Sequence, residues 1–292
     1  MVVSKFTNCC HQLECSQGLR KHICISACKF AGLQNALHIR LLETFLFLQV
    51  FKTSQTLHNQ RKMTSPQAAS FPLLLKDAKL LLNAPYPSVE TGYAQTSDGM
   101  YHIAASTYMP NCTGEMIKWW FDWIHTTDQY KLWHPLDHVY SSWEGPRDNS
   151  STYIGGHHLV HEYIGGHLAK LKISFLEPAL YFGDDWEKDL EKEGYELAVC
   201  GRTSNWNDET GEAMRTGHLI HLIKKEKIGV RMRSRFWLGD IEGVTDPEVR
   251  KCAVPDFLPE GLCRHATEEM AILASILPGL YEKYARKEQG RL

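Results

Sequence analysis

A run of five β-like segments followed by one long amphipathic helix is the feature that most constrains how this chain can fold. The segments cover residues 152–163, 167–176, 196–206, 215–224 and 228–238, and turn residues separate them. The connections are too short for crossover helices, so we expect neighbouring strands to pair antiparallel. The closing helix is predicted over residues 261 to about 284, where apolar residues recur at helical spacing, and Pro278 should kink its last turns.

Three more elements are predicted ahead of this sheet. Residues 70–82 form a short leucine-rich helix that the proline-containing stretch 83–87 ends, and residues 101–108 alternate like a strand. Residues 113–125 show a helical pattern with Thr113 as the N-cap. An antiparallel sheet with one long C-terminal helix is an α+β layer fold of the helix-grip kind, in which the twisted sheet can wrap the helix and leave a cavity.

The charge of the chain is distributed unevenly. Residues 1–62 carry eight Lys or Arg against two acids, a net charge of +6, whereas the rest carries 24 basic and 32 acidic residues, a net charge of −8. A body with this balance has no chain-wide basic field for a phosphate backbone, which argues against nucleic acid as the main partner. We therefore expect residues 1–62 to be a poorly ordered basic, cysteine-containing extension and residues 63–292 to be the folded domain.

The basic extension shows no secretory signal, because no compact apolar stretch follows directly on a basic start. Its most apolar piece, residues 37–51, is interrupted by Arg40 and Glu43 and falls short of the roughly 20 apolar residues of a membrane span. Five of the nine cysteines crowd into residues 9–28 without CxxC spacing, and the other four are scattered, as is typical of a reducing compartment. We expect a cytoplasmic protein, with organellar transit by the basic leader as the alternative.

The strongest local signal for chemistry lies in the closing helix. His265 and Glu269 stand four residues apart, which places both side chains on one helical face, as a chelating pair requires. A solvated surface pair has the same spacing, but Ala266, Leu273 and Leu277 lie close to Glu269 on the apolar stripe. The pair therefore borders the core, where a carboxylate must be paired or metal-bound, since burying a bare charge costs several kcal/mol.

Two further clusters of titratable residues lie earlier in the chain. Residues 130–138 contain His134 and His138, but Pro135 breaks the helical ladder between them, so we expect at most one to be a ligand while the other orients it or packs. Residues 157–163 contain Glu162, a carboxylate in mid-strand and a better functional candidate than the neighbouring histidines, which can lie exposed. HExxH, GxSxG, GxGxxG and Walker patterns do not occur, which argues against the enzyme classes that they mark.

Five runs in this order resemble the 2,4-diacetylphloroglucinol hydrolase family, which also includes phloretin hydrolases. They are YKLWHPLDH (residues 130–138), HEYIGG (161–166), GHLIH (217–221), RSRFWLG (233–239) and HATEE (265–269), and the resemblance spans about residues 73–284. It implies a helix-grip fold like those of birch-pollen-allergen and START-like proteins. It also implies a zinc-dependent hydrolase that cleaves the C–C bond between an acyl group and a phenolic, phloroglucinol-type ring, releasing a carboxylic acid and the deacylated phenol.

The resemblance also assigns a metal site. Its cofactor would be Zn2+, and two His and two Glu would bind it, with His134 as the alternative first ligand: His138, Glu162, His265 and Glu269. Two neutral imidazoles and two carboxylates balance the charge of the cation and leave a position for water, whose pKa the metal lowers. The hypothesis is that this water attacks the acyl carbonyl, while the ring, protonated first into its keto form, leaves.

Pocket residues follow from the same resemblance. The catalytic roles fall to His221 and Tyr130, which manage the phenolic oxygens, together with Glu162. Tyr130 and His221 also bind the substrate, and Ser141 corresponds to a further polar pocket residue. Phe236 stands where the family has a second pocket tyrosine, and the missing hydroxyl implies a substrate that is less hydroxylated or differently placed.

Two other classes of function stay open on the sequence. Helix-grip proteins often carry hydrophobic ligands without catalysis, and 8 Trp, 12 Tyr and 11 Phe would serve a carrier as well as an enzyme. A metal-dependent cyclase or decarboxylase on the same scaffold is the other. The metal discriminates, because a carrier does not need His265 and Glu269 as a chelate. The expected partner is a small-molecule aromatic ketone. We expect the protein to have no membrane span, and we expect a homodimer only by analogy with such folds.

Overall fold

The computed structural model describes residues 72–83, 87, 89–144 and 153–289, and its centre is an eight-stranded antiparallel sheet. The strand order is β1-β2-β8-β7-β6-β5-β4-β3, so β1 and β3 are the edges. The strands are β1 (Gly92–Gln95), β2 (Tyr101–Met109), β3 (His138–Glu144), β4 (His157–Ile164), β5 (His167–Leu176), β6 (Tyr195–Trp206), β7 (Ala213–Lys225) and β8 (Val230–Leu238).

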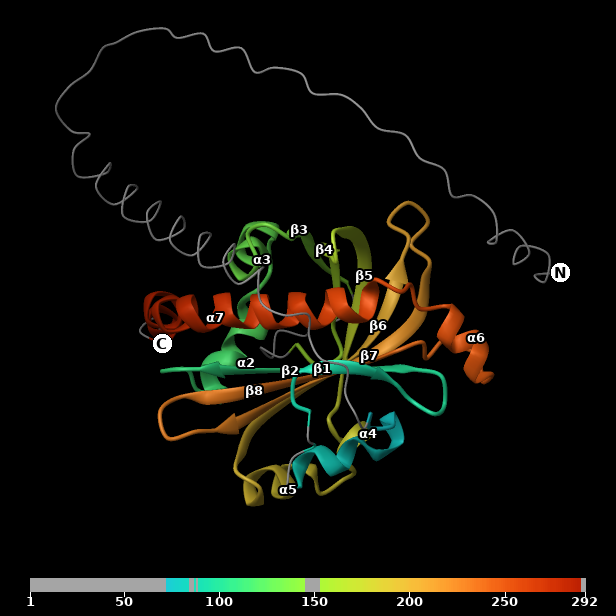
Figure 1. Cartoon of the computed structure of the whole chain (residues 1–292). Coiled ribbons are helices and arrows are strands. Elements are labelled where there is room, and N and C mark those ends of the chain that lie inside the picture. The colour runs from blue at the N-terminus through green and yellow to red at the C-terminus, as the bar shows by residue number, and fades with distance from the viewer. Residues whose placement is uncertain (1–71, 84–86, 88, 145–152, 290–292) are drawn as a thin grey trace, which may run out of the picture. The chain divides into compact units, whose positions relative to one another are not determined.

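Helices cover both faces of this sheet. They are η1 (Leu75–Leu82, a 3-10 helix), α2 (Gly114–Trp123), α3 (Thr127–Trp133), α4 (Ala179–Phe182), α5 (Trp186–Lys192), α6 (Pro247–Cys252) and α7 (Leu258–Gln289). Figure 1 shows α7 crossing one face of the sheet, with η1, α4 and α5 on the opposite face. No helix in the described ranges is both long enough and apolar enough to cross a membrane.

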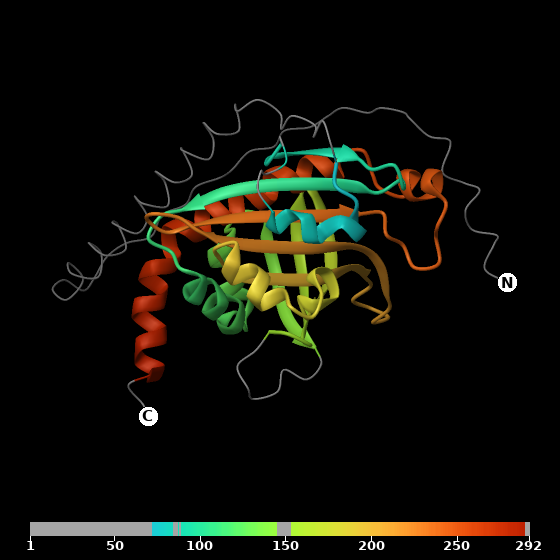
Figure 2. The same ribbon diagram turned by 90° about the horizontal axis from the view of Figure 1, so that it is seen from below.

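The core between α7 and the sheet follows from the apolar stripe of the helix. Met270, Leu273 and Leu277 are fully buried there, and they pack in one cluster with residues of α2 and the inner sheet face. Fully burying side chains of this size stabilises the fold by roughly 1.5–3 kcal/mol each. Pro278 lies inside α7, and Figure 2 shows the last part of the helix turning away from the rest, as expected where a proline removes a ladder hydrogen bond.

A second core cluster lies on the outer face of the sheet, the face opposite α7. Residues from Leu73 through η1 lie across the sheet there. The indole nitrogen of Trp237 donates to the carbonyl of Leu73 at 2.8 Å, and a guanidinium nitrogen of Arg233 donates to the carbonyl of Leu81 at 2.6 Å. Glu90 pairs with Arg233 at 2.7 Å, which compensates the burial of that charge. The segment from Leu73 through η1 is thus held by polar contacts to β8 as well as by apolar packing.

His102 makes this outer cluster sensitive to acid. Its ring is 3% exposed and stacks on Trp237, and its Nδ1 accepts a hydrogen bond from the amide of Leu73 at 3.0 Å. Burial, together with the nearby Arg235, lowers the pKa of His102 from 6.5 to about 3. The unfolded chain therefore binds a proton at this residue more readily than the folded protein, so protonation below pH 6.5 favours unfolding.

We expect this residue to contribute to a fall in the free energy of unfolding as the pH drops from 6.5 towards about 3. The slope of that free energy against pH reports how many protons the chain takes up on unfolding. In the variant His102→Phe, which can still stack on Trp237, this number should be smaller by up to one proton over the same interval. Urea unfolding at a series of pH values measures both slopes. Parallel slopes for the two proteins would contradict the expectation, whatever the difference in their absolute stability.

The structure confirms the predicted fold class and most predicted elements, and it corrects others. The five β-like segments are β4 to β8, although β4 begins at His157, and all neighbours pair antiparallel. The side chain of Thr113 caps α2, accepting from the amide of Met116. The expectation of connections without helices was wrong between β5 and β6, where α4 and α5 lie. The extension 1–62, with its cysteines, lies outside the described residues.

Candidate metal centre

The first side of the site is built by α3, an element that periodicity does not reveal. A reciprocal cap begins this helix: the hydroxyl of Thr126 accepts from the amide of Gln129 at 3.3 Å, and the side chain of Gln129 accepts from the amide of Thr126 at 3.0 Å. The helix presents Tyr130 to the interior and stops before Pro135, which cannot continue the ladder. The chain then turns into β3.

A β-bulge places the first histidine. The register between β3 and β4 shifts between His138 and Tyr140, so β3 carries one extra residue there. As a result, His138 stands directly opposite Glu162 of β4, and both side chains are buried. Directly opposite residues on an antiparallel pair are close neighbours on one face of the sheet, so this register alone brings an imidazole and a carboxylate together.

A close approach of backbones brings α7 to the same place. The β4–β5 turn consists of Gly165 and Gly166, both with positive φ, as a two-residue hairpin requires. Gly261 of α7 packs on this turn, and a Cβ at Gly261 would lie only 2.8 Å from the Cα of Gly165. His265 follows one helical turn later and Glu162 precedes the glycine turn by three residues, so the contact sets their distance.

The four predicted metal ligands converge in the structure. The Nε2 atom of His138 lies 3.7 Å from an oxygen of Glu162 and 3.7 Å from an oxygen of Glu269, and the Nε2 atom of His265 lies 3.9 Å from each. All four residues are between 2% and 8% exposed. Donor atoms around a tetrahedral zinc ion lie roughly 3.3 Å apart, and these imidazole–carboxylate separations are about half an ångström wider.

A hydrogen bond fixes which nitrogen of His138 faces this cluster. The Nδ1 atom of His138 is bonded to the carbonyl of Tyr130 at 2.9 Å, which directs Nε2 to the carboxylates. Among the described residues, neither Nε2 of His138 nor Nε2 of His265 has a hydrogen-bond partner. Two buried, unpartnered nitrogens aimed at two buried carboxylates are the arrangement that a cation would complete. This donor set therefore fits zinc.

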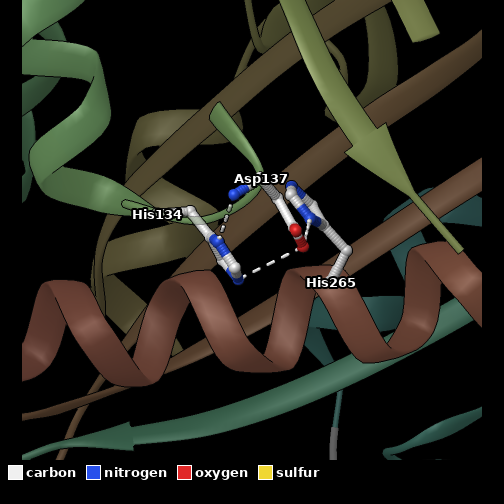
Figure 3. Close-up of side chains that lie close together, drawn as sticks. All are labelled: His134, Asp137 and His265. Carbon is white, nitrogen blue, oxygen red and sulfur yellow. Dashed lines mark hydrogen bonds and ion pairs between the residues drawn. The ribbon is translucent and has the colours of Figure 1, made fainter. Parts of the chain in front are cut away.

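A second group of donors lies beside the first, and His265 is shared between them. His134, Asp137 and His265 place donor atoms within 4.8 Å of one another, as do His138, His265 and Glu269. Figure 3 shows the carboxylate of Asp137 between the two imidazoles, 3.5 Å from the Nε2 atom of His134 and 3.5 Å from the Nδ1 atom of His265. The Nδ1 atom of His134 accepts from the amide of Asp137 at 3.1 Å.

The electrostatics of the site favour positive charge. Burial raises the pKa of Glu269 to about 8, with Glu162 contributing to the rise and His265 opposing it. Burial lowers the pKa of His265, but Asp137, Glu162 and Glu269 outweigh it and raise the pKa to about 9. The pKa of His138 lies well below its usual value because of burial and the neighbouring His265. The two buried carboxylates of Glu162 and Glu269 thus attract a cation or a proton to the site.

A cavity of about 130 Å³ opens beside these ligands, and its wall is mostly apolar. Apolar lining residues come from α2, the inner sheet face and the start of α7, and include Phe121, Ile173, Phe175, Leu219, Phe236 and Leu262. Polar side chains that line it are Tyr130, His158, Glu162, Thr203, Asn205, Thr216, His221, His265 and Glu269. A mostly apolar pocket with a few convergent polar groups is typical of a site for a small organic molecule.

Three predicted pocket residues lie in this wall. The hydroxyl of Tyr130 donates to Glu162, and its ring stacks on His138 at a centroid distance of 3.7 Å. The Nδ1 atom of His221 is bonded to the hydroxyl of Ser234 at 2.8 Å, and burial lowers the pKa of His221 to about 4. The ring of Phe236 meets His221 edge-on at 5.9 Å. His221 is therefore a neutral imidazole at pH 7.

The structure places Ser141 behind the wall rather than in it. Its hydroxyl is bonded to the Nε2 atom of His158 at 2.7 Å, and His158 is the residue that lines the cavity. His158 is 3% exposed, so exposure was the wrong expectation for this histidine. The signal was present in the sequence, because residues 158 and 162 share one face of a strand.

Thr203 is a cavity residue that the sequence interpretation missed. It lies on β6, and within the described part of the chain its hydroxyl has no hydrogen-bond partner. A buried hydroxyl without a partner costs free energy, which a bound ligand with a polar group could recover. No motif marks such a residue, because its role depends on the register of three neighbouring strands.

Comparison with solved structures finds matches with low TM-scores and low sequence identity. The crystal structure of Ara h 8.0201 matches with a TM-score of 0.38 and 9% identity, covering 62% of this chain and 99% of that one. A protein from Arthrobacter aurescens matches with a TM-score of 0.39 and 13% identity, covering 64% of this chain and 93% of that one. The fold class itself rests on the topology of the present chain.

Comparison of sequences identifies relatives of known activity. The phloretin hydrolase of Eubacterium ramulus is 33% identical over 208 residues, which cover 65% of this chain and 70% of that protein. The 2,4-diacetylphloroglucinol hydrolase of Pseudomonas protegens is 26% identical over 237 residues, covering 72% of this chain and 73% of that protein. The family model described as the DAPG hydrolase PhiG domain matches residues 73–282, and the chain therefore belongs to that family.

Proposed function

We propose that this protein is a zinc-dependent hydrolase that cleaves the C–C bond between an acyl group and a phenolic, phloroglucinol-type ring. The observation that supports it most directly is the convergence of two imidazoles and two carboxylates beside a mostly apolar cavity, whose wall includes Glu162, His265 and Glu269. The relatives named phloretin hydrolase and 2,4-diacetylphloroglucinol hydrolase support the same reaction class. A ligand carrier would have no use for the buried charges.

The proposed ligands are His138, Glu162, His265 and Glu269. We favour His138 over His134 because the Nδ1 atom of His134 accepts from a backbone amide, so its neutral ring carries the proton on Nε2. A nitrogen that carries a proton cannot bind a metal. When bound, zinc supplies Lewis acidity, which polarises a carbonyl group and lowers the pKa of water.

The reaction divides one water molecule between two products. The water oxygen joins the acyl carbon to give the carboxylic acid, the bond between this carbon and the ring breaks, and the ring carbon gains a proton to give the phenol. His221, neutral at pH 7 and buried in the cavity wall, is suited to pass a proton to or from a phenolic oxygen. Tyr130 orients Glu162 through its hydrogen bond and confines the ligand from the side of α3.

Metal analysis of the purified protein, coupled to an assay on mono- and diacylphloroglucinols and related aryl ketones, tests the proposal. We expect about one zinc ion per chain, and a chelator should abolish turnover that added zinc restores. Metal-free protein that still turns over would refute the role of zinc. Bound metal without turnover on any aryl ketone, combined with ligand binding, would favour the carrier function instead.

Phe236 should influence which ring is preferred. Its ring lines the cavity beside His221, so a tyrosine there would place a hydroxyl near the phenolic edge of a substrate. One additional hydrogen bond contributes about 0.5–1.5 kcal/mol. We expect Phe236→Tyr to raise kcat/KM for a trihydroxylated aryl ketone, relative to its dihydroxylated analogue, by about 2- to 10-fold. An unchanged ratio between the two substrates would place the phenolic edge elsewhere.

A further inference from the structure

We infer that Asp137 is a positioning residue that directs His265 to the cation, with His134 holding Asp137 in place. This inference rests on the proposed metal centre. Figure 3 shows the arrangement: the carboxylate of Asp137 lies between two imidazoles, with 3.5 Å from its Oδ2 atom to Nε2 of His134 and 3.5 Å to Nδ1 of His265. Asp137 does not line the apolar cavity and instead lines a separate pocket with His265 and Glu268, so it is placed to act through His265 and not on a substrate in the apolar cavity.

The two ring nitrogens of His265 face different groups. Nε2 lies 3.9 Å from the carboxylates of Glu162 and Glu269, whereas Nδ1 faces Asp137. For Nε2 to offer its lone pair to a metal, the proton of the neutral ring must stay on Nδ1. A carboxylate beside Nδ1 stabilises this tautomer and fixes the plane of the ring, the arrangement that metal-binding histidines commonly have.

Asp137 is itself held from two sides. Its carbonyl accepts from the amide of Tyr163 at 2.9 Å, which ties its backbone to β4. Its own amide donates to Nδ1 of His134 at 3.1 Å, so the proton of the neutral His134 ring lies on Nε2, which points at the carboxylate of Asp137. His134 is 1% exposed, and its Nε2 lies 3.5 Å from the carboxylate of Asp137 and 3.6 Å from that of Glu268, so the proton on Nε2 faces both carboxylates.

A second cation bound by His134, Asp137 and His265 is the competing explanation of the same cluster. It would require Nε2 of His134 to bind metal while Nδ1 accepts from the amide of Asp137, which leaves both nitrogens without a proton. If His265 also bound the first cation, both of its ring nitrogens would likewise have to be without a proton. A single cation, with the carboxylate of Asp137 held electrostatically between the rings of His134 and His265, requires no ring to lose both protons.

The variant Asp137→Asn tests the inference by metal affinity. Loss of such a carboxylate typically weakens metal binding 10- to 100-fold, so we expect the Kd for zinc, measured by competition with a chromophoric chelator, to rise by about that factor. KM should stay within about 2-fold, because Asp137 does not line the cavity. Asp208→Asn is the matched control, since the same kind of carboxylate lies 3.5 Å from Nε2 of His161 outside the cluster.

The outcomes separate this inference from the proposed function. Wild-type protein without zinc affinity would refute the metal centre itself. If Asp137→Asn binds zinc with the affinity of the wild type, only the positioning role is refuted. If the wild-type chain binds two zinc ions and the variant loses one of them, the second cation is favoured. If Asp137→Asn does not fold, His134→Gln replaces it: we expect a Kd raised by about 3- to 10-fold, and a loss as complete as that of His138→Gln would overturn the inference.

Discussion

Replacing Glu269 with glutamine is expected to remove the bound metal and to lower kcat by at least about 1000-fold. Glu269 is 8% exposed, and its carboxylate lies within 3.9 Å of the Nε2 atoms of both His138 and His265, so its charge is directed at the proposed cation position. A metal contributes several kcal/mol to such a reaction, and each 1.36 kcal/mol is about tenfold in rate. Zinc content and steady-state kinetics on an acylphloroglucinol measure both effects.

The control for this variant is Glu260→Gln, on the same helix. Glu260 pairs with Arg264 at the surface, 3.0 Å apart, and an exposed pair of this kind contributes little, so metal content and kcat should stay close to those of the wild type. Turnover that persists after Glu269→Gln has lost its metal would remove the basis of the proposed chemistry. Retained metal with lost turnover would instead assign Glu269 a role in proton transfer.

The buried pair of His265 and Glu269 on α7 could be predicted because helical periodicity is a local property. Four residues separate His265 from Glu269, and the apolar residues around them mark the buried face, so one segment of sequence contains both the geometry and the environment. The strands β5 to β8 could be predicted for the same reason. Their alternation and turn residues are local signals, which the antiparallel pairing of neighbours then assembles.

The choice between His134 and His138 could not be made from the sequence. It depends on a β-bulge after His138 and on an amide that occupies Nδ1 of His134, and neither feature has a residue pattern of its own. The short helix α3 was hidden because its seven residues are too few for periodicity, although its Thr126–Gln129 cap resembles a helix start. Short elements held by tertiary contacts thus escaped prediction.

The pocket residues were harder to predict because a cavity wall combines several strands. Ser141 was assigned to the pocket by resemblance, but in this chain it supports His158, which reaches the cavity in its place. Thr203 lies two strands away from β4 and shares its row across the sheet with His158 through Ile173 of β5. Such a row exists only once the register is set.

Replacing His221 with glutamine should lower kcat by about 100- to 10,000-fold, the usual contribution of a positioned acid or base, while zinc content stays unchanged. The ring is 4% exposed, lines the cavity and has no direct contact with the four proposed ligands. Loss of turnover without loss of metal would therefore separate proton transfer from metal binding. The matched control is His157→Gln, because His157 forms the same 2.8 Å bond to a serine hydroxyl, that of Ser174, outside the cavity wall.

The pH dependence of kcat offers an independent check on the same residue. Since burial lowers the pKa of His221 to about 4, the ring stays neutral from there upward, and protonation of His221 should reduce kcat only as the pH falls towards 4. An ordinary, solvated histidine would produce that loss near 6.5. A loss of kcat centred near pH 6.5 that disappears in His221→Gln would show that this imidazole is hydrated in the working enzyme. The assumption that the cavity excludes water, on which the proposed proton transfer depends, would then have to be abandoned.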